Sequence, residues 1–372
     1  MSLLKVHLKS PAALNKWKDA FGFGRVYQSL VKELARRDDV RLVKDFRQAD
    51  IQVCLCLPFQ RWEYSHWFGD NIYPLRRKNL LNRFRRWWEN MALGDNHPVK
   101  TIYTVWETTR LPYSWAEMMN EMAAVFTASS WCAEVIKNDG IMPPVHVVPH
   151  GIDPESFPYV ERDWQAKPFV YLSQYMHPHD RKGGMWVRQA FTELNLPDTY
   201  LVEKWYPTIC AAWGPANYPE ARRVEIGQFL NRDSYMDLLR QCHVSVNPFR
   251  GEAFALMPAE TAATGMATIL TNWSGATDYM RPDCFRPLKY SLCEPGEDYV
   301  NTQPAYEART PPAQDALVDM DDLKNAMREM YENRDAAQQM GLKAREHLIK
   351  NWTWKHAANK FVASCWEVLG VQ

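Results

Sequence analysis

The chain has 372 residues, of which 46% are hydrophobic and 24% are charged, and its formal net charge is zero. This composition is typical of a globular protein and excludes a disordered or fibrous chain. One hydrophobic core rarely serves so many residues, so the length predicts two domains.

Apolar runs in the sequence are short. The most continuous one, 51–59, has the length of a buried strand and falls short of the ~20 residues that a membrane-spanning helix needs. The first residues, 1–17, contain lysines but lack the apolar core of a secretion signal. We therefore expect a cytoplasmic protein without a transmembrane segment.

Cysteine spacing and charge distribution indicate which metal sites, disulfides and partners to expect. The eight cysteines include no C-x-x-C pair, which argues against a zinc site and a disulfide framework, so we expect buried thiols and no metal. Residues 1–150 hold 21 Lys and Arg against 15 Asp and Glu, whereas the remainder holds 23 against 29. The basic first half indicates contact with something anionic.

The first half alternates apolar strands with amphipathic helices, which predicts a parallel sheet with right-handed crossovers. The expected strands are 3–8, 40–43, 51–57, 101–105, 124–127 and 146–148, and the expected helices are 26–36, 113–121 and 131–138.

A second alternation follows residues 153–167, which are rich in proline and charge and which we interpret as the link between domains. Its expected strands are 169–173, 200–204, 224–227, 244–247 and 268–271, and its expected helices are 184–194, 234–241 and 258–265. Long helices at 320–332, 334–351 and 354–369 close the chain. The polar stretch 301–315 is expected to be a surface loop.

Two glutamates, Glu252 and Glu260, stand with seven residues between them around an expected helix start, where Pro258 suits the first turn. The backbone N–H groups of 253–256 would be free to bind a phosphate, which the helix dipole also favours. The alternative is that both are ordinary carboxylates at a helix start, which the same dipole stabilises.

Three further motifs accompany this pair in chain order: 147–153 (Val-Val-Pro-His-Gly-Ile-Asp), 180–183 (Asp-Arg-Lys-Gly) and 352–354 (Trp-Thr-Trp). Together they resemble glycosyltransferase family 4 and its GT-B relatives over about residues 101–366. The resemblance implies the α/β GT-B fold, with two Rossmann-like domains facing across a cleft. It places an acceptor-binding domain at 1–153, a nucleotide-sugar domain at 154–350 and a C-terminal helix returning to the first domain at 351–372.

The resemblance also implies a retaining transfer from a nucleotide-sugar donor, which is a substrate, so that no cofactor and no metal are expected. It assigns Glu252 to the donor sugar, Glu260 to the nucleotide ribose and Lys182 with Arg181 to the diphosphate. The backbone of Phe254, Ala255 and Leu256 would face the phosphates. UDP-glucose is the first expectation for the donor.

The sequence departs from the family pattern at two places. The family's usual Gly-Arg dipeptide is replaced by Gln174-Tyr175 at the end of an expected strand, so we expect Arg181, His177 or His179 to substitute. Glu107 stands where many members have a histidine after the fourth strand. It either contacts donor or acceptor at the carboxyl edge of the sheet, or it is a paired structural carboxylate.

Other segments are expected to line the cleft on the donor side. Gly22 and Gly24 follow the first strand, where a glycine loop lets the backbone approach a phosphate, although a plain turn fits as well. His150 lies in the glycine turn that ends the first domain. Ser274 would offer a hydroxyl to the donor, or it caps a helix.

The segment 76–88 is basic with interleaved Leu, Phe and Trp, and we expect Arg83, Arg86 and Trp87 to bind the acceptor. On a helix its apolar face suits a membrane surface or a nucleic-acid backbone, but it also fits a helix packed on the core. The aromatic residues of 62–67 either line an acceptor pocket or belong to the core.

The first expectation for the acceptor is a lipid-linked or envelope glycan, which would bring the enzyme to a membrane periphery, and the second is a hydroxymethylated base in phage-type DNA. A non-catalytic sugar-binding protein and a nucleotide-sugar epimerase remain open as alternatives of another class.

Overall fold

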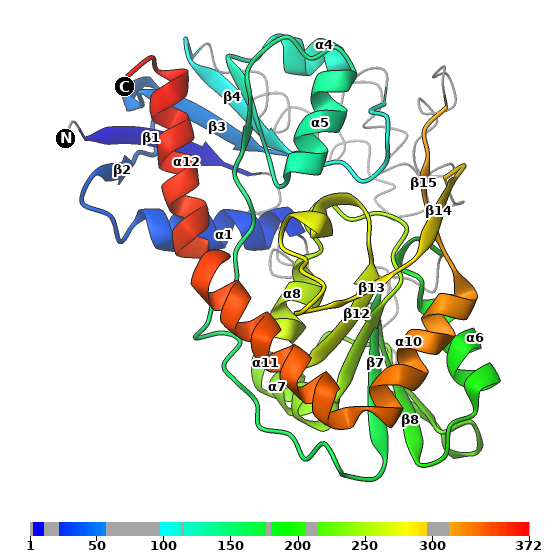
Figure 1. Ribbon diagram of the computed structural model, residues 1–372. Coiled ribbons are helices and arrows are strands. Elements are labelled where there is room, and N and C mark those ends of the chain that lie inside the picture. Colours follow the sequence, from blue (N-terminus) through cyan, green and yellow to red (C-terminus); the bar gives the residue numbers. More distant parts are fainter. Residues whose placement is uncertain are drawn as a thin grey trace, which may run out of the picture.

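The computed structural model describes residues 3–10, 22–56, 97–112, 115–175, 180–205, 215–295 and 312–371. Two parallel sheets, each flanked by helices, form two domains, as the two alternations in the sequence predict (Figure 1). We call them the first and the second domain.

The sheet of the first domain has six parallel strands in the order β2-β1-β3-β4-β5-β6. They are β1 (Leu4–Lys9), β2 (Val40–Leu42), β3 (Ile51–Leu55), β4 (Lys100–Thr104), β5 (Ala124–Thr127) and β6 (Val145–Val147). The helices are α1 (Gly22–Leu34), η2 (Phe46–Gln48), α4 (Trp115–Asn120) and α5 (Ser130–Asn138). Each expected strand is present within two residues of its expected bounds, because short apolar runs are buried on both faces of a parallel sheet.

The sheet of the second domain has the order β13-β12-β11-β7-β8-β10-β9. Its strands are β7 (Phe169–Tyr175), β8 (Thr199–Trp205), β9 (Pro215–Tyr218), β10 (Arg223–Ile226), β11 (Val244–Asn247), β12 (Ala267–Thr271) and β13 (Arg286–Leu288). Its helices are η4 (Asp180–Lys182), α6 (Gly184–Leu194), η5 (Pro219–Ala221), α7 (Arg232–Gln241), α8 (Leu256–Ala263) and η6 (Ser274–Asp278). Six strands are parallel, and β9 runs antiparallel to β10 at the edge. The pattern of the sequence did not predict β9 or β13.

A hairpin that the sequence did not predict extends from the second domain. Strands β14 (Tyr290–Cys293) and β15 (Asp315–Val318) pair antiparallel and rise beside the first domain in Figure 1. The expected surface loop 301–315 is therefore wrong at Ala313, which is buried, and at Asp315, which is buried and begins a strand. Residues 301–311 lie outside the described part of the chain.

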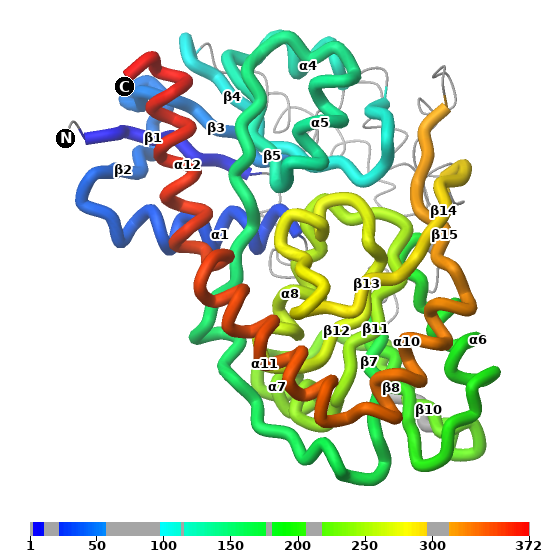
Figure 2. The backbone as a smooth tube through the Cα atoms, viewed as in Figure 1, coloured from blue at the N-terminus to red at the C-terminus, as the bar shows by residue number. Residues whose placement is uncertain are grey.

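Three helices close the chain: α10 (Met320–Glu332), α11 (Arg334–Asn351) and α12 (Trp354–Val368). Helix α12 leaves the second domain and lies against α1, as Figure 2 shows. Phe361 and Ala358 of α12 share a core with Val26 and Leu30 of α1. Burying each large apolar side chain of this core contributes about 1.5–3 kcal/mol, so the returning helix stabilises the first domain.

A backbone bridge joins the domains where the chain enters and leaves the second one. The N–H of Ile152 donates to the carbonyl of Trp352 over 2.7 Å, and the N–H of Trp354 donates back to the carbonyl of Ile152 over 3.2 Å. A Cβ on Gly151 would lie 2.3 Å from the backbone nitrogen of Trp354, so only glycine allows this approach.

Strand order places a crevice in the second domain. The chain continues from β7 to β8 on one side, and β11 pairs with β7 on the other. Ligands of such sheets bind outside the carboxyl ends of the strands at this switch point. The residues that follow β7 and β11 therefore lie where a ligand is expected.

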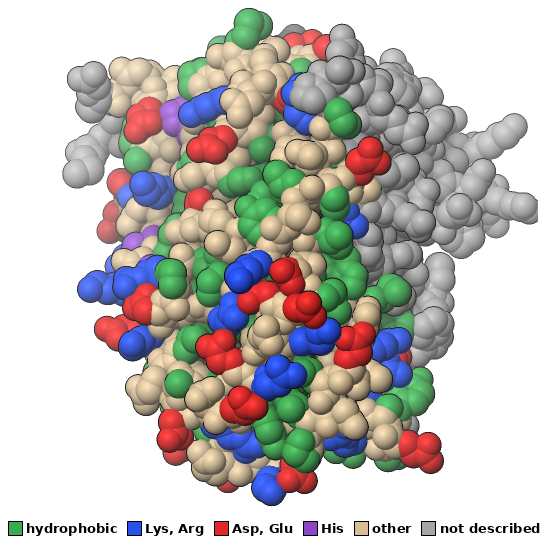
Figure 3. Space-filling view, turned by 45° about the vertical axis from the view of Figure 1, so that its right-hand side comes forward, with side chains coloured by type: hydrophobic (Ala, Val, Ile, Leu, Met, Phe, Trp, Pro, Cys, Tyr) green, Lys and Arg blue, Asp and Glu red, His purple; other side chains and the backbone are tan. Residues whose placement is uncertain are grey.

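Within the described ranges, no helix is both long enough and apolar enough to pass through a bilayer. Figure 3 shows Lys and Arg side chains interspersed with Asp and Glu over the visible face.

Candidate active site

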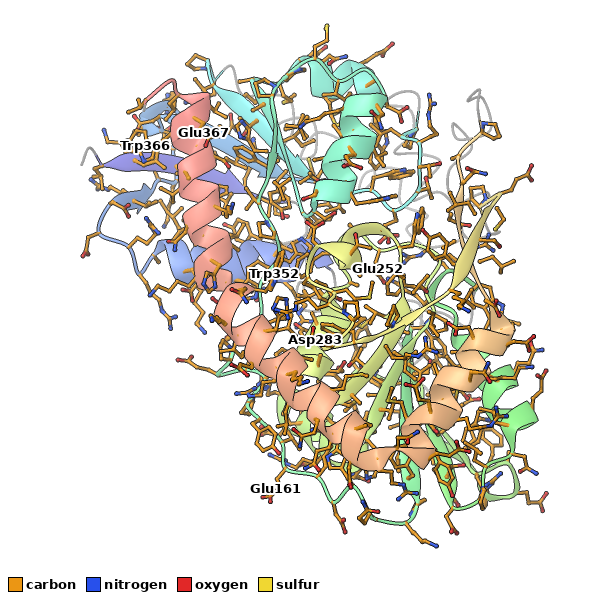
Figure 4. The ribbon with its side chains drawn as sticks, viewed as in Figure 1. Glu161, Glu252, Asp283, Trp352, Trp366 and Glu367 are labelled. Atoms are coloured by element: carbon orange, nitrogen blue, oxygen red, sulfur yellow. The ribbon has the colours of Figure 1, made fainter. Side chains whose placement is uncertain are left out.

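Lys182 and Glu252 form an ion pair at the switch point. Lys182 ends η4, which follows β7, and Glu252 lies in the loop between β11 and α8, so the strand ends bring the two side chains together. Lys182 Nζ contacts Glu252 Oε1, and each side chain is only 12% exposed. Figure 4 labels Glu252 at the junction of the two domains.

The loop that carries Glu252 is held by the segment before η6. The N–H of Glu252 donates to Ser274 Oγ over 3.0 Å, and the N–H of Gly275 donates to the carbonyl of Glu252 over 2.8 Å. A Cβ on Gly275 would lie 1.9 Å from the carbonyl oxygen of Ala253, which makes glycine necessary there. The expectation that Ser274 caps a helix is wrong, because its hydroxyl serves the backbone of Glu252 and Trp273 is the N-cap of η6.

Helix α8 begins directly behind this loop. Ala255 adopts a left-handed conformation with φ 62°, and Pro258 lies in the first turn as the sequence predicts. The hydroxyl of Tyr279 donates to the carbonyl of Ala255 over 2.9 Å and fixes the turn. N–H groups in a first helical turn have no acceptor within the helix, so the loop and α8 present donors suited to an anion.

Glu260, on α8, is buried and faces a cation from the first domain. Arg25 Nη2 donates to Glu260 Oε1, and the exposed fractions of the two side chains are 35% for Arg25 and 4% for Glu260. Burial raises the pKa of Glu260, and the charge and hydrogen bond of Arg25 oppose that rise. Arg25 is a site residue that the sequence pattern did not reveal, although it directly follows Gly22-Phe23-Gly24.

Gly22 and Gly24 form a helix start and not the loop that the sequence predicts. Both glycines lie in the first turn of α1, which begins at Gly22 and not at residue 26. Glycine is disfavoured inside helices, and the propensity pattern therefore placed the start too late. Gly24 is buried and Gly22 is exposed.

An ion pair between Arg181 and Glu107 joins the two domains. Arg181 Nη1 donates to Glu107 Oε2, and the side chains are 21% and 25% exposed. Glu107 is thus a paired carboxylate just beyond the carboxyl end of β4, as the second alternative expects, and its contact with donor or acceptor stays a prediction. The N–H of Arg250 donates to the carbonyl of Arg181 over 2.8 Å and ties η4 to the loop of Glu252.

His150 lies between the domains within an aromatic cluster. Its ring centroid is 5.2 Å from that of Phe254 and 6.0 Å from that of Trp354. Both ring nitrogens are shielded from solvent, and the described residues offer them no hydrogen-bond partner. Burial, assisted by the charge of Arg25, lowers the pKa of His150 to about 3, so the ring is neutral at physiological pH.

Several expected residues lie outside the described part of the chain. These are the acceptor residues Arg83, Arg86 and Trp87, the aromatic residues within 62–67, and the two histidines proposed to replace the family's arginine, His177 and His179. At the place of that arginine, Gln174 Oε1 accepts a hydrogen bond of 2.6 Å from the hydroxyl of Tyr235.

The residues that the structure describes bear on metal binding. They contain no group of three His, Cys, Asp or Glu side chains placed to hold a metal ion. A D-x-D triplet occurs at Asp319-Met320-Asp321, but Asp319 is the N-cap of α10 and accepts the N–H groups of Asp321 and Asp322. Metal independence therefore stays a prediction.

The protein has two α/β domains, an ion pair between Lys182 and Glu252 at a switch point, and a C-terminal helix that returns to the first domain. These features define a protein of the GT-B type. Residues 216–361 match the family described as Family 4 Glycosyltransferase in conflict systems. The resemblance to family 4 is thus confirmed over this part of the chain.

A relative from a virus agrees with this match. A protein of the Sulfolobus islandicus filamentous virus (isolate Iceland/Hveragerdi), provisionally named glycosyltransferase 45, is 30% identical over 137 residues. The aligned part is 35% of this chain and 36% of the viral protein, so the chain matches about a third of that relative's length.

Solved structures share the fold. Sucrose-phosphate synthase from Thermosynechococcus elongatus aligns with a TM-score of 0.61 at 12% identity, over 99% of both chains. Trehalose 6-phosphate synthase from Burkholderia multivorans aligns with a TM-score of 0.57 at 12% identity, over 100% of this chain and 99% of its own. TarM from S. aureus, solved with fondaparinux, alpha-GlcNAc-glycerol and UDP, gives 0.55 at 10% identity, over 84% of this chain and 55% of its own. These likenesses confirm the GT-B fold.

Proposed function

We propose that this chain is a glycosyltransferase that moves a sugar from a nucleoside diphosphate donor to an acceptor held by the first domain. The observation that carries the proposal is the Lys182–Glu252 pair, set at the switch point beside the first turn of α8. Glu260 lies on α8, and Glu252 lies in the loop that leads into it. This loop and helix together would contact both ends of a nucleotide sugar.

The arrangement suits departure of a nucleoside diphosphate. Negative charge grows on the leaving phosphate in the transition state, and preorganised cations and N–H dipoles stabilise it most where water is excluded. Lys182 and Arg181 supply the cations, and each is held by a carboxylate that a bound diphosphate would replace. Glu252 would then be free to accept hydrogen bonds from hydroxyl groups of the sugar.

Retention of configuration and independence from metal ions are part of the proposal and rest on the resemblance to family 4. UDP-glucose is the proposed donor, and the presence of UDP in the TarM complex supports a uridine nucleotide. The nucleotide sugar acts as a substrate, so no cofactor is proposed.

For the acceptor we propose a lipid-linked or envelope glycan, with the reaction in the cytoplasm at the periphery of a membrane. The TarM complex with alpha-GlcNAc-glycerol supports a small glycan of this kind. A second candidate is a hydroxymethylated base of phage-type DNA. It is favoured by the family's description as acting in conflict systems and by the viral relative.

Thermal unfolding with nucleotides tests the donor. A ligand that binds only the folded protein stabilises it by about 2.7 kcal/mol at 100 times its Kd, so UDP or GDP at millimolar concentration should raise the Tm. Nucleotide release from a panel of nucleotide sugars, with and without EDTA, then identifies the donor and tests the need for metal. No stabilisation by any nucleoside diphosphate would refute the proposal.

The same assay separates the alternatives. A sugar-binding protein would release no nucleotide, and an epimerase would change the donor sugar without an acceptor. Stimulation of release by anionic vesicles with a lipid-linked glycan would support the first acceptor, and stimulation by hydroxymethylated DNA the second. DNA binding should also weaken steeply with salt, because phosphate contacts release counterions.

A further inference from the structure

Strand β15 contacts Arg250, a residue of the loop that carries Glu252. Arg250 Nη2 and Nε donate to Asp315 Oδ1 over 2.6 Å and 2.9 Å, and Nη2 also donates to the carbonyl of Glu294 over 2.6 Å. The N–H of Ala316 donates to the carbonyl of Arg250 over 2.9 Å. The side chains of Arg250 and Asp315 are 8% and 0% exposed, so this is a buried pair.

Arg250 also connects the Arg181–Lys182 turn to the loop that carries Glu252. Its N–H donates to the carbonyl of Arg181, and it stands two residues before Glu252 in the chain. A shift of Arg250 would therefore move the Glu252 loop and the Arg181–Lys182 turn together.

The segment before β15 is anchored in the first domain. Ala313 is buried in a core cluster with Trp106 and Leu111. The N–H of Gln314 donates to Thr109 Oγ1 over 2.8 Å, and the N–H of Thr109 donates to the carbonyl of Gln314 over 3.0 Å. Residues 312–318 thus reach from the second domain to the first, and we call them the strap.

These contacts form a closed circuit that passes through both domains. Thr109 stands two residues after Glu107, whose carboxylate accepts from Arg181. From Arg181 the path runs through Arg250 and Asp315 along the strap and back to Thr109. Only the link through Arg250 and Asp315 carries a buried charge pair.

We propose that Arg250 and Asp315 are a positioning pair, which sets Glu252 and the Arg181–Lys182 turn in register against the first domain. The inference rests on the proposed function. A planar guanidinium that donates to several fixed acceptors sets an orientation, whereas a hydrophobic contact of equal volume would stabilise the fold without doing so. A misplacement of about 1 Å at a reacting centre can cost about 100-fold in rate, which sets the expected size of the effect.

Asp315→Asn tests the pair, with Asp322→Asn as its matched control. Asp322 is also a nearly buried partner of an arginine in the second domain, with Arg286 Nη2 3.0 Å away, but it lies on α10 outside the circuit. We expect Asp315→Asn to lower kcat of nucleotide release by about 100-fold while the Kd of UDP changes little. Asp322→Asn should lower the Tm and leave kcat near that of the wild type.

A second measurement needs no activity. The amide proton of Thr109 is held by Gln314, so its hydrogen exchange should accelerate in Asp315→Asn and not in Asp322→Asn. If Asp315→Asn does not fold, Thr109→Val removes the acceptor of Gln314 at the other end of the strap and should lower kcat in the same direction.

The outcomes separate this inference from the proposed function. If the wild type binds no nucleoside diphosphate, the proposed function fails. Independently of that result, unchanged hydrogen exchange at Thr109 in Asp315→Asn would overturn the link from Asp315 through the strap to the first domain. Faster exchange with unaltered kcat would overturn the positioning role and leave only a link between domains. A fall in kcat no larger in Asp315→Asn than in Asp322→Asn would overturn it as well.

Discussion

Arg25 of the first domain donates to Oε1 of Glu260 of the second, across 235 positions of sequence. The carboxylate is buried and the guanidinium is about a third exposed, so the cation reaches Glu260 from the solvent side. Any ribose hydroxyl that donates to Glu260 must share the carboxylate with Arg25 or displace it.

Glu260→Ala should weaken UDP binding by about 10–100-fold, because hydrogen bonds to a charged group contribute about 1.5–3 kcal/mol. The fold should survive, since Arg25 can turn to solvent once its partner is gone. Calorimetric titration and a Tm measurement check both statements. Glu161→Ala is the control, because Glu161 is exposed at the far end of the second domain in Figure 4.

Arg25→Met should destabilise the protein by about 1–3 kcal/mol at pH 8, less than a fully buried pair would lose, because Arg25 is partly exposed. The pKa of Glu260, already raised by burial, should rise further without its cation. The folded state then holds a proton that the unfolded state gives up, so the defect should shrink as pH falls toward the pKa of Glu260. Urea unfolding at pH 8 and pH 5 measures the difference, and an equal defect at both values would contradict this account.

Lys182→Met and Glu252→Gln should each reduce nucleotide release by about 30–1000-fold, the effect of losing about 2–4 kcal/mol of transition-state stabilisation. The free energy of unfolding should fall by less than this, because each side chain is still 12% exposed and the charge left behind is not fully buried. Steady-state kinetics of the two variants measure this effect, with Lys324→Met as the control, because Lys324 of α10 pairs with Glu193 of α6, 3.1 Å away, and not with a residue of the site. Rates near the wild-type value in both variants would place the site elsewhere.

Gly275→Ala should disrupt the loop of Glu252, because its Cβ would meet the carbonyl oxygen of Ala253 at 1.9 Å. Backbone atoms cannot yield as a flexible side chain can, so both the Tm and the turnover should fall. Gly22→Ala is the matched control, since no atom of the described residues lies within 4 Å of its added Cβ. Equal behaviour of the two variants would show that the loop is not held as described.

His150 should make stability depend on pH. Its pKa is about 3 in the folded protein against an ordinary 6.5, so the unfolded state binds the extra proton between these values. Stability is therefore complete above pH 6.5 and falls as pH drops toward 3, by about 3 kcal/mol at pH 4.5. His150→Phe, which keeps an aromatic ring, should flatten this part of the stability curve. A slope identical to that of the wild type would contradict the prediction.

Local pattern was sufficient for most of the secondary structure. Helices α6, α10 and α11 and strands β5 and β11 have the predicted bounds, because periodicity and caps are written within each segment. Helix α1 was placed too late, since glycine propensity argues against a helix that packing nevertheless stabilises. The strap was missed because a polar, proline-containing stretch resembles a loop until Arg250 is seen to pair with Asp315.

The sequence by itself determined the two α/β alternations, the order of the family motifs and the placing of Glu252 and Glu260 around one helix start. Only the tertiary structure decided which charges meet: Arg25 with Glu260, Arg181 with Glu107 and Arg250 with Asp315. The physical reason is that helix and strand patterns arise from neighbours in the chain. The partner of a buried charge is whichever side chain the packing of two domains brings within reach.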